Sequence, residues 1–240
     1  MAKERLNKYI ASCGLCSRRD ADRLIAEGRV VVNGSVADMG MQVDEHDEIQ
    51  VNGKSLHGKN EKVVLAYYKP VGVTCTEKDR FADKKITDMV KFPVRVTYAG
   101  RLDKDSEGLI LLTNDGGLID AMMRGSAGHE KEYIVKVNKE ITEDFLNQMA
   151  EGVWLSELKL KTRPCTVEKI GKFTFRIILT QGVNRQIRRM AAELSYKVTA
   201  IKRIRVVNIQ LASLKPGQFR QISGDELHVL YNSCAERERE

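Results

Sequence analysis

Two apolar runs enclose the densest polar segment of the chain, and residues 94–113 read VRVTYAGRLDKDSEGLILLT. The flanking runs, 94–98 and 109–113, have the length and the side chains of buried strands. Residues 100–108 between them hold three carboxylates and two basic side chains. Because such a loop would be fixed at both ends by buried strands, we expect it to be a rigid platform for polar chemistry.

Outside this segment, strand and helix patterns follow one another irregularly. Further strands are predicted at 63–68, 132–137 and 173–179, and helices at 84–91, 117–124, 142–151, 184–194 and 225–231. The absence of regular strand–helix alternation and of a glycine-rich phosphate loop argues against a doubly wound nucleotide-binding fold. The pattern predicts an α+β fold whose mixed, mostly antiparallel central sheet is flanked by helices.

The first 60 residues form a pattern of their own, two helices followed by a small sheet. Apolar residues recur at helical spacing from Leu6 to Ile10, and Ser17 can cap a second helix. Short strands joined by Asn-Gly turns follow. A polar stretch without periodicity at 55–62 is the best linker in the sequence. We therefore expect an N-terminal domain at 1–60 and a larger domain at 61–240.

Basic side chains gather in two regions. The chain carries a formal net charge of +7. Residues 181–205 hold seven bases and one acid, and residues 1–29 hold seven bases and four acids. Two basic surfaces of this kind predict a polyanionic partner, and nucleic acid is the commonest polyanion of the cytoplasm. A solvated helix face would give the same pattern, and charge alone does not distinguish the two.

The sequence indicates a cytoplasmic protein. Its longest apolar run, 63–68, has six residues, far short of the roughly 20 that a membrane helix requires. The first eight residues are charged and lack the apolar core of a signal peptide. The five scattered cysteines are expected to stay reduced, and the pair Cys13 and Cys16 lacks the second pair of a zinc site. We expect no membrane association and no metal.

The three carboxylates of the polar loop allow more than one chemistry. Asp103, Asp105 and Glu107 match the opening of a calcium-binding loop, but Asn114 stands where that loop needs its closing glutamate. Alternatively, one carboxylate does covalent or acid–base work while a nearby base such as Arg101 keeps it ionised. An exposed acidic turn with local ion pairs is the third interpretation. The residue types alone do not single out Asp103.

The same segment, extended to 100–116 (GRLDKDSEGLILLTNDG), resembles the signature of the RsuA-type pseudouridine synthases, which isomerise uridine in ribosomal RNA. Other blocks of that family stand in the right order, at 68–72 (YKPVG), 129–133 (HEKEY) and 181–190 (QGVNRQIRRM). The N-terminal domain resembles the alpha-L type RNA-binding domain named after a small-subunit ribosomal protein, through RLNKYI and CSRRDAD within its first 22 residues. The resemblance covers nearly the whole chain.

Within this RsuA/RluB/RluF-type family, residues 129–133 together with 203–208 (RIRVVN) resemble the RluF branch, which acts on large-subunit rRNA. Arg205 stands where many relatives carry glycine, which argues against the other branches. The resemblance implies an isomerase that converts a specific uridine of 23S rRNA, and of a tRNA as an additional substrate, to pseudouridine. It implies cleavage of the glycosidic bond and reattachment of the base through carbon, with no cofactor.

The resemblance also assigns three catalytic positions. Asp103 becomes the catalytic aspartate, and Tyr133 becomes the aromatic ring that stacks on the flipped target base. By the same resemblance, Arg188 is the positively charged residue that pairs with Asp103 and keeps it ionised. Without the family, Tyr133 would be interpreted as a half-buried strand residue and Arg188 as a solvated helix residue.

Further residues are expected to bind the RNA rather than react with it. Arg185 and Arg189 lie in the predicted helix at 184–194 and are interpreted as phosphate contacts. Arg101 and Leu102 are expected to support the loop and the pocket. The basic residues of the N-terminal domain expected to hold RNA backbone are Lys3, Arg5, Arg18, Arg19 and Arg23.

Two other functions fit parts of the sequence. A non-catalytic RNA-binding or ribosome-assembly protein would need only the basic surfaces, but the intact segment around Asp103 argues against it. A nucleoside hydrolase would also use a carboxylate, but it would want a second acid or a metal and no RNA-binding domain. No long apolar stripe is left unassigned, so we expect a monomer.

Overall fold

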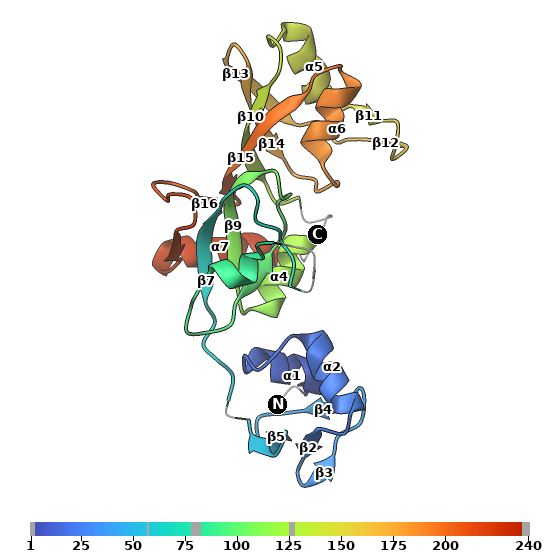
Figure 1. Ribbon diagram of the computed structural model, residues 1–240, viewed down its shortest axis with the longest axis vertical. Coiled ribbons are helices and arrows are strands. Elements are labelled where there is room, and N and C mark those ends of the chain that lie inside the picture. Colours follow the sequence, from blue (N-terminus) through green and yellow to red (C-terminus); the bar gives the residue numbers. More distant parts are fainter. Residues whose placement is uncertain (1–2, 57, 78–82, 125–127, 237–240) are drawn as a thin grey trace. The chain divides into compact units, whose positions relative to one another are not determined.

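The computed structural model describes residues 3–56, 58–77, 83–124 and 128–236, and the chain divides into two compact units (Figure 1). The first unit comprises 1–63 with the short segments 92–96 and 114–116, and the second comprises the other residues. Residue 57 of the predicted linker lies outside the described residues.

In its described residues the first unit contains two helices, α1 (Leu6–Ser12) and α2 (Arg18–Ala26). Its strands are β1 (Glu4–Arg5), β2 (Val30–Val32), β3 (Ser35–Val36), β4 (Gln42–Val43), β5 (Ile49–Val51) and β6 (Lys54–Ser55). As predicted, Ser17 caps α2, because its hydroxyl accepts from the Asp20 amide at 3.2 Å. The helices and the sheet β3-β2-β5-β6 enclose a core around Leu6, Ile10 and Val30.

The second unit is built on a large sheet with the strand order β13-β14-β10-β15-β9-β7-β17. In addition, β8 pairs with β9, and β16 pairs with β15. These strands are β7 (Val64–Lys69), β8 (Thr97–Ala99), β9 (Glu107–Thr113), β10 (Lys131–Val137), β13 (Thr166–Gly171), β14 (Thr174–Leu179), β15 (Val198–Val206), β16 (Ile209–Gln210) and β17 (Phe219–Gln221). Among the described strands, β9 and β15 pair in parallel and the other neighbours pair antiparallel. The predicted mixed, mostly antiparallel sheet is confirmed.

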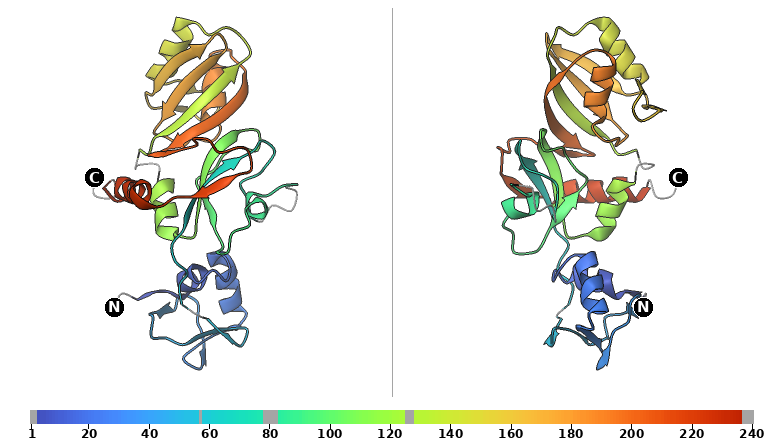
Figure 2. Two further views of the ribbon diagram at one scale, coloured as in Figure 1. Left: turned by 90° about the vertical axis from the view of Figure 1, so that its left-hand side faces the viewer. Right: turned by 45° about the vertical axis from the view of Figure 1, so that its right-hand side comes forward.

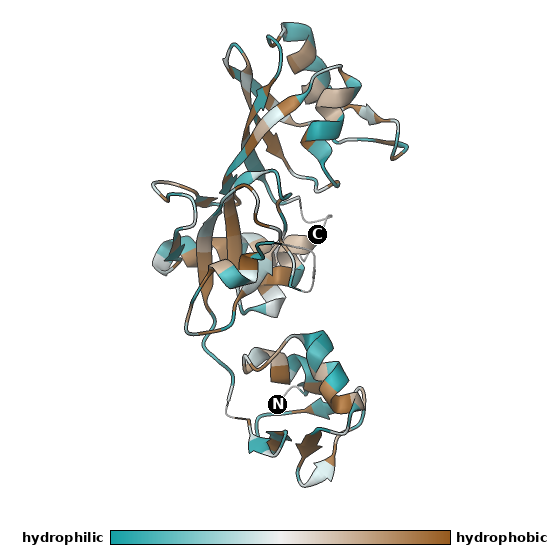
Figure 3. Ribbon diagram, viewed as in Figure 1, coloured by the Kyte–Doolittle hydropathy of each residue, from teal (hydrophilic) through white to brown (hydrophobic). Residues whose placement is uncertain are grey.

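Helices lie beside this sheet toward both of its ends (Figure 2), and each set of helices packs on a hydrophobic core. Helices α5 (Glu143–Glu151) and α6 (Gln186–Glu193) pack against β10, β14 and β15 through residues such as Phe145 and Met190. Helices α4 (Gly116–Met123) and α7 (Gly224–Glu236) pack against β7 and β9 through residues such as Leu118 and Leu230. Figure 3 shows β7 and β9 as a largely hydrophobic band, because burial on both faces favours apolar side chains throughout.

The structure departs from the predicted elements at several places. The long strand β15 was not predicted, because its basic residues were interpreted as a charged surface, yet it lies between β10 and β9. Helix α3 spans only Ile86–Met89 of the predicted 84–91, and β8 begins three residues later than the predicted strand at 94–98. A hairpin of β11 (Trp154–Leu155) and β12 (Leu160–Lys161) was also not predicted. No helix in the described ranges is long and apolar enough to cross a membrane.

Candidate active site

The polar loop, residues 100–106, connects β8 to β9 and is anchored at several points. The Ser106 amide donates to the Asp103 carbonyl at 3.1 Å, and the Gly72 amide donates to the Lys104 carbonyl at 2.7 Å. Leu102 and Ser106 are buried, with 8% and 2% of their surfaces exposed. Leu102 is thus held in the interior, while the Asp103 side chain keeps 32% of its surface exposed.

The loop enters β9 through a close contact with β15. Gly108 has φ +110° and pairs with Arg203 in the parallel register. A Cβ at Gly108 would lie 2.6 Å from the Arg203 backbone nitrogen and closer still to its carbonyl oxygen. Glycine is required here by both the backbone angle and the space. The Arg203 side chain is buried and donates to the carbonyls of Leu109 at 2.7 Å and Arg101 at 3.3 Å. Arg203 thus fixes the loop from beneath.

Arg185 contacts two carboxylates of the loop, those of Asp103 and Asp105. Its Nη1 lies 3.7 Å from Asp103 Oδ2, and its Nη2 donates to Asp105 Oδ2 at 3.1 Å. Arg185 precedes α6 in the left-handed region, with φ 53° and ψ 33°, rather than within the helix as predicted. The left-handed conformation is uncommon for residues other than glycine. Arg185 adopts it at the point where its side chain contacts the polar loop.

Arg188, on the first turn of α6, contacts the loop from a more buried position. Its Nη2 donates to the Asp105 carbonyl at 3.1 Å and lies 3.2 Å from Asp105 Oδ2. Its Nη1 donates to the Val198 carbonyl at 3.3 Å. Burial alone would raise the pKa of Asp105, but the hydrogen bond from Arg185 and the charge of Arg188 outweigh it and lower that pKa below its ordinary value of 3.8.

The expected pairing of Arg188 with Asp103 is therefore corrected by the structure. Arg188 pairs with Asp105, and Arg185 is the residue whose ion pair reaches Asp103. The reason is positional. Arg185 lies at the start of α6 in the left-handed conformation and extends over the loop, whereas Arg188 lies three residues further on and is hydrogen-bonded to β15 as well.

Asp103 and Tyr133 line one cavity of about 290 Å³ in the second unit. The walls come from the polar loop, the end of α4, β10, the segment before α6 and β15. Beside Asp103 and Tyr133, its polar lining includes Arg101, Ser106, Arg124, His129, Lys131, Thr180, Gln181, Asn184, Arg185, Gln186 and Arg203, and its apolar lining includes Leu102, Met122, Leu179, Val183 and Ile201. The structure therefore brings together the predicted carboxylate, tyrosine and Arg185, with apolar side chains between them.

Tyr133 and Lys131 stand two residues apart on β10, so their side chains share one face of the sheet. This face continues into the core that α5 and α6 cover, and Tyr133 packs at the edge of that core. Lys131 Nζ donates to the His129 carbonyl at 3.1 Å. Burial, together with the charge of Arg203, lowers the pKa of Lys131 to about 8. Sequence reasoning missed Lys131, although it stands inside the HEKEY block.

Lys69 lies beneath the loop and is a second lysine that sequence reasoning missed. It is fully buried at the end of β7 and donates to the carbonyls of Pro70 at 3.0 Å and Val73 at 2.9 Å. Burial lowers its pKa, while Cys75, Asp103 and Asp105 act in the opposite direction. The YKPVG block was the available signal, because it places a lysine directly after a buried strand.

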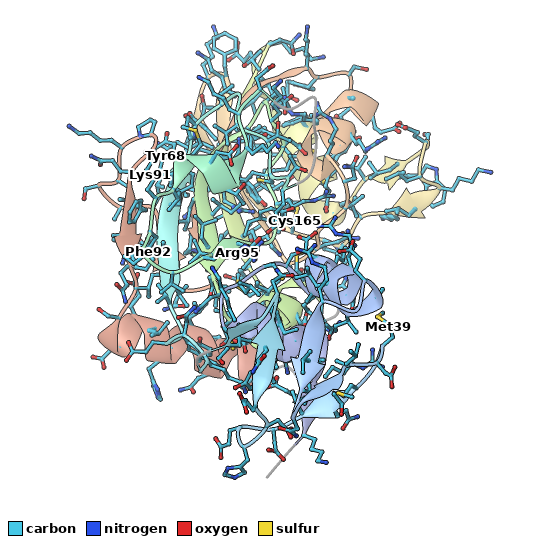
Figure 4. All side chains as sticks on the ribbon, turned by 60° about the horizontal axis from the view of Figure 1, so that its bottom comes forward. Met39, Tyr68, Lys91, Phe92, Arg95 and Cys165 are labelled. Atoms are coloured by element: carbon cyan, nitrogen blue, oxygen red, sulfur yellow. The ribbon has the colours of Figure 1, made fainter. Side chains whose placement is uncertain are left out.

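Glu107, the third carboxylate of the segment 100–108, is the first residue of β9 and contacts Tyr68 instead of Arg185. The hydroxyl of Tyr68, which is labelled in Figure 4, donates to Glu107 Oε2 at 3.0 Å. Burial and this hydrogen bond raise the pKa of Tyr68 to about 12. The three carboxylates thus do not converge as in a calcium loop. In the part of the chain that the structure describes, no cluster of three His, Cys, Asp or Glu side chains is placed to hold a metal ion.

The other predicted binding residues lie at the surface. Arg101 lines the cavity and is exposed, whereas Arg189 pairs with Glu157 and donates to the Asn184 carbonyl at 3.0 Å. In the first unit, Arg23 lies 3.3 Å from Asp20. The predicted RNA contacts of that unit are all exposed: Lys3, Arg5, Arg18, Arg19 and Arg23.

Comparison with known proteins identifies the family of the chain. The model of the RNA pseudouridylate synthase family matches residues 63–193, and that of the S4 domain matches residues 4–49. The chain is 44% identical over 229 residues to the dual-specificity RNA pseudouridine synthase RluF of Salmonella typhi, covering 95% of this chain and 78% of the relative.

Two further relatives extend the comparison. The chain is 37% identical over 235 residues to the ribosomal large subunit pseudouridine synthase B of Bacillus subtilis, covering 95% of each. A crystal structure of a pseudouridylate synthase superposes with a TM-score of 0.69 at 29% identity, covering 94% of this chain and 99% of the other. Because the family model matches more than half of the chain and a relative 44% identical to it covers 95% of it, this chain belongs to the RNA pseudouridylate synthase family of isomerases.

Proposed function

We propose that the chain converts a specific uridine of 23S rRNA to pseudouridine, with a tRNA uridine as a second substrate. The observation that supports this most is the shared cavity of Asp103, Tyr133 and Arg185. The relatives named for large-subunit RNA and for dual specificity support the choice of substrates. The reaction would take place in the cytoplasm, where ribosomal and transfer RNA are found, and a monomer would suffice because the cavity is formed within one chain.

Asp103 is the residue proposed to act on the sugar. Breaking the bond between uracil and ribose builds positive charge on the sugar, and a carboxylate can stabilise or attack that centre. Arg185 pairs with this carboxylate at 3.7 Å and would hold it in position beside the sugar. Arg188 would act through Asp105 and Ser106, which it contacts at 3.2 and 3.5 Å, and is therefore a positioning residue.

Tyr133 is proposed to hold the base during the isomerisation. A uridine must leave its helix to reach the cavity, and an aromatic face compensates for the lost stacking. The apolar side chains of Leu102, Val183 and Ile201 in the same lining would limit the access of water to the sugar once RNA is bound. Exclusion of water matters because water would otherwise trap the sugar and release free uracil.

The N-terminal domain, 1–60, is proposed to hold RNA backbone while the domain at 61–240 does the chemistry. Its exposed Lys3, Arg5, Arg18 and Arg19 are suited to phosphate contacts. Arg101 and Arg189 would contact phosphates closer to the cavity, with Arg189 exchanging Glu157 for RNA.

The assignment to the RluF branch is supported by contacts between the two blocks that suggested it. Arg205 Nε donates to Glu132 at 2.7 Å, and its Nη2 donates to Glu130 at 3.0 Å. A glycine at position 205 could make neither contact. The arginine and the two glutamates therefore form one structural unit beside β10.

The experiment that tests the substrate is a pseudouridine map of rRNA and tRNA from cells with and without the gene. The gene would be restored as wild type or as Asp103→Asn. We expect a 23S rRNA site and a tRNA site that disappear on deletion and return with wild type alone. If no site changes, the chain is a binding protein with the fold of a synthase. If only other RNAs change, the proposed substrates are wrong.

A further inference from the structure

The cavity is lined by many basic side chains and very little negative charge. Among the described lining residues, Asp103 is the sole carboxylate and Lys131 is the sole lysine. The titratable and charged groups that share the cavity with Lys131 are Arg101 and Asp103 of the loop, Arg124 after α4, His129 before β10, Tyr133 on β10, Arg185 before α6 and Arg203 on β15. Such a cavity suits a group that becomes negatively charged during the reaction.

Lys131 lines the same cavity as Tyr133. The two side chains are on the same face of β10, and the cross-strand partners of Lys131 are the apolar residues Leu179 and Val206. An ammonium has three donors, and one of them is directed at the His129 carbonyl at 3.1 Å. The group is half-buried and poorly solvated, which strengthens any hydrogen bond that it makes to a ligand.

The reaction creates a negative charge on the uracil base within the cavity. When the bond between ribose C1′ and uracil N1 breaks, its electron pair stays with the base, and the charge spreads over N1 and the two carbonyl oxygens. Asp103 stabilises the sugar but repels this anion. A fixed cation at the carbonyl edge would stabilise the charge as it develops.

We propose that Lys131 is a further catalytic residue, whose ammonium donates a hydrogen bond to a uracil carbonyl oxygen and stabilises the uracil anion. This inference rests on the proposed function. Lys131 keeps its proton throughout, so the base leaves as the anion and rotates. Uracil C5 then forms the new bond to C1′ with the electron pair of the anion. The C5 hydrogen finally leaves as a proton to a basic group or to water, and N1 takes up one proton from water, so atoms and charge balance.

The pH dependence of the reaction distinguishes this role from that of a neutral general base. The pKa of Lys131 is about 8 in the free protein, well below the ordinary lysine value of 10.5. If the ammonium is required, kcat/KM falls as the pH rises through about 8, because this ratio reports the free enzyme. If neutral lysine were required, kcat/KM would rise over the same range.

The test uses the full-length protein and RNA labelled with tritium at uracil C5, isolated from cells that lack the gene. Isomerisation releases the tritium to water. Lys131→Met removes the charge and keeps the length, whereas Lys131→Arg keeps a charge that does not titrate in this range. Lys136→Met is the matched control, because Lys136 lies on the same strand, is exposed and is not among the cavity residues. Melting temperatures report folding of each variant.

We expect Lys131→Met to lower kcat on the order of 10²-fold, with KM changed less than about threefold and a melting temperature equal to or above that of wild type. Lys131→Arg should recover part of kcat and lose the decline near pH 8. A decline that persists in Lys131→Arg, or a Lys131→Met protein as active as Lys136→Met, would overturn the inference. If wild type itself releases no tritium, the proposed function fails, and this inference fails with it.

Discussion

Arg185 holds two carboxylates at once, with Nη1 3.7 Å from Asp103 Oδ2 and Nη2 3.1 Å from Asp105 Oδ2. One carboxylate is proposed to face the sugar, and the other is also fixed by Arg188. The guanidinium therefore links the reacting side chain to a neighbour that is itself anchored. Because of this link, we expect replacement of Arg185 and of Arg188, three residues apart, to have different effects.

Arg185→Met should mainly lower kcat, whereas Arg188→Met should mainly lower the free energy of unfolding. Arg188 is largely buried and bonds to the Val198 and Asp105 carbonyls, so its loss should lower the free energy of unfolding by about 2 kcal/mol. Arg185 is half-exposed, so its loss should leave stability nearly unchanged but lower kcat about tenfold or more. Denaturant unfolding and tritium release measure both. An opposite pattern would contradict the two assignments.

Gly108→Ala should disrupt the junction of the loop with the sheet. The new methyl group would overlap the backbone of Arg203, and neither main chain can move without breaking the β9–β15 pairing. We expect the free energy of unfolding to fall by about 3 kcal/mol or more, with loss of activity. Gly217→Ala is the control, since Gly217 also has positive φ (84°) but open space around it. Its cost should stay at roughly 1–2 kcal/mol. Equal costs at the two sites would refute the close-contact explanation.

Arg205→Gly should destabilise the segment that supports the RluF-branch assignment. Glu132 is buried, with 8% of its surface exposed, and would keep only its contact with Arg176 at 3.3 Å among those described. We expect the free energy of unfolding to fall by about 2 kcal/mol. The double variant with Glu132→Gln should recover part of the loss, because an amide is less costly to bury than an unpaired carboxylate. Additive losses would show that the two residues are independent.

Asp105 should contribute to stability in a pH-dependent manner. Its pKa is lowered in the folded state, so its ion pairs stabilise the protein fully above its ordinary pKa of 3.8, and the contribution is lost as the pH falls through the lower folded value. The difference in unfolding free energy between wild type and Asp105→Asn should therefore be largest near neutral pH and shrink toward pH 3. A difference that stays constant over this range would exclude the ion-pair explanation.

Much of the fold was predictable because its strands follow simple patterns. Runs such as 109–113 and the alternation at 173–179 appear as β9 and β14. Strand β15 was missed because Lys202, Arg203 and Arg205 interrupt its apolar residues, so the segment was taken as surface charge. Arg203 shows the limit of charge counting. It was counted among residues expected to meet a polyanion, but it is buried and bonds the loop carbonyls.

The resemblance to the family predicted which residues belong to the candidate site. It did not predict the contacts that these residues make with one another. Asp103 and Tyr133 share a cavity although one lies in the loop before β9 and the other on β10, and no spacing along the chain indicates this proximity. The exchange of partners between Arg185 and Arg188 depends on the left-handed backbone of Arg185, which periodicity does not predict. Lys131 was overlooked because its depressed pKa depends on burial and on Arg203, which only the folded chain brings near.

The most direct test of the proposed chemistry compares Asp103→Asn with Asp105→Asn in single-turnover tritium release, alongside RNA binding. Both variants remove one negative charge from the same loop, so they affect RNA attraction equally. We expect Asp103→Asn to bind RNA within about threefold of wild type and to release no measurable tritium, whereas Asp105→Asn retains turnover. Tritium release by Asp103→Asn at a rate near that of wild type would contradict the assignment of Asp103 as the catalytic carboxylate.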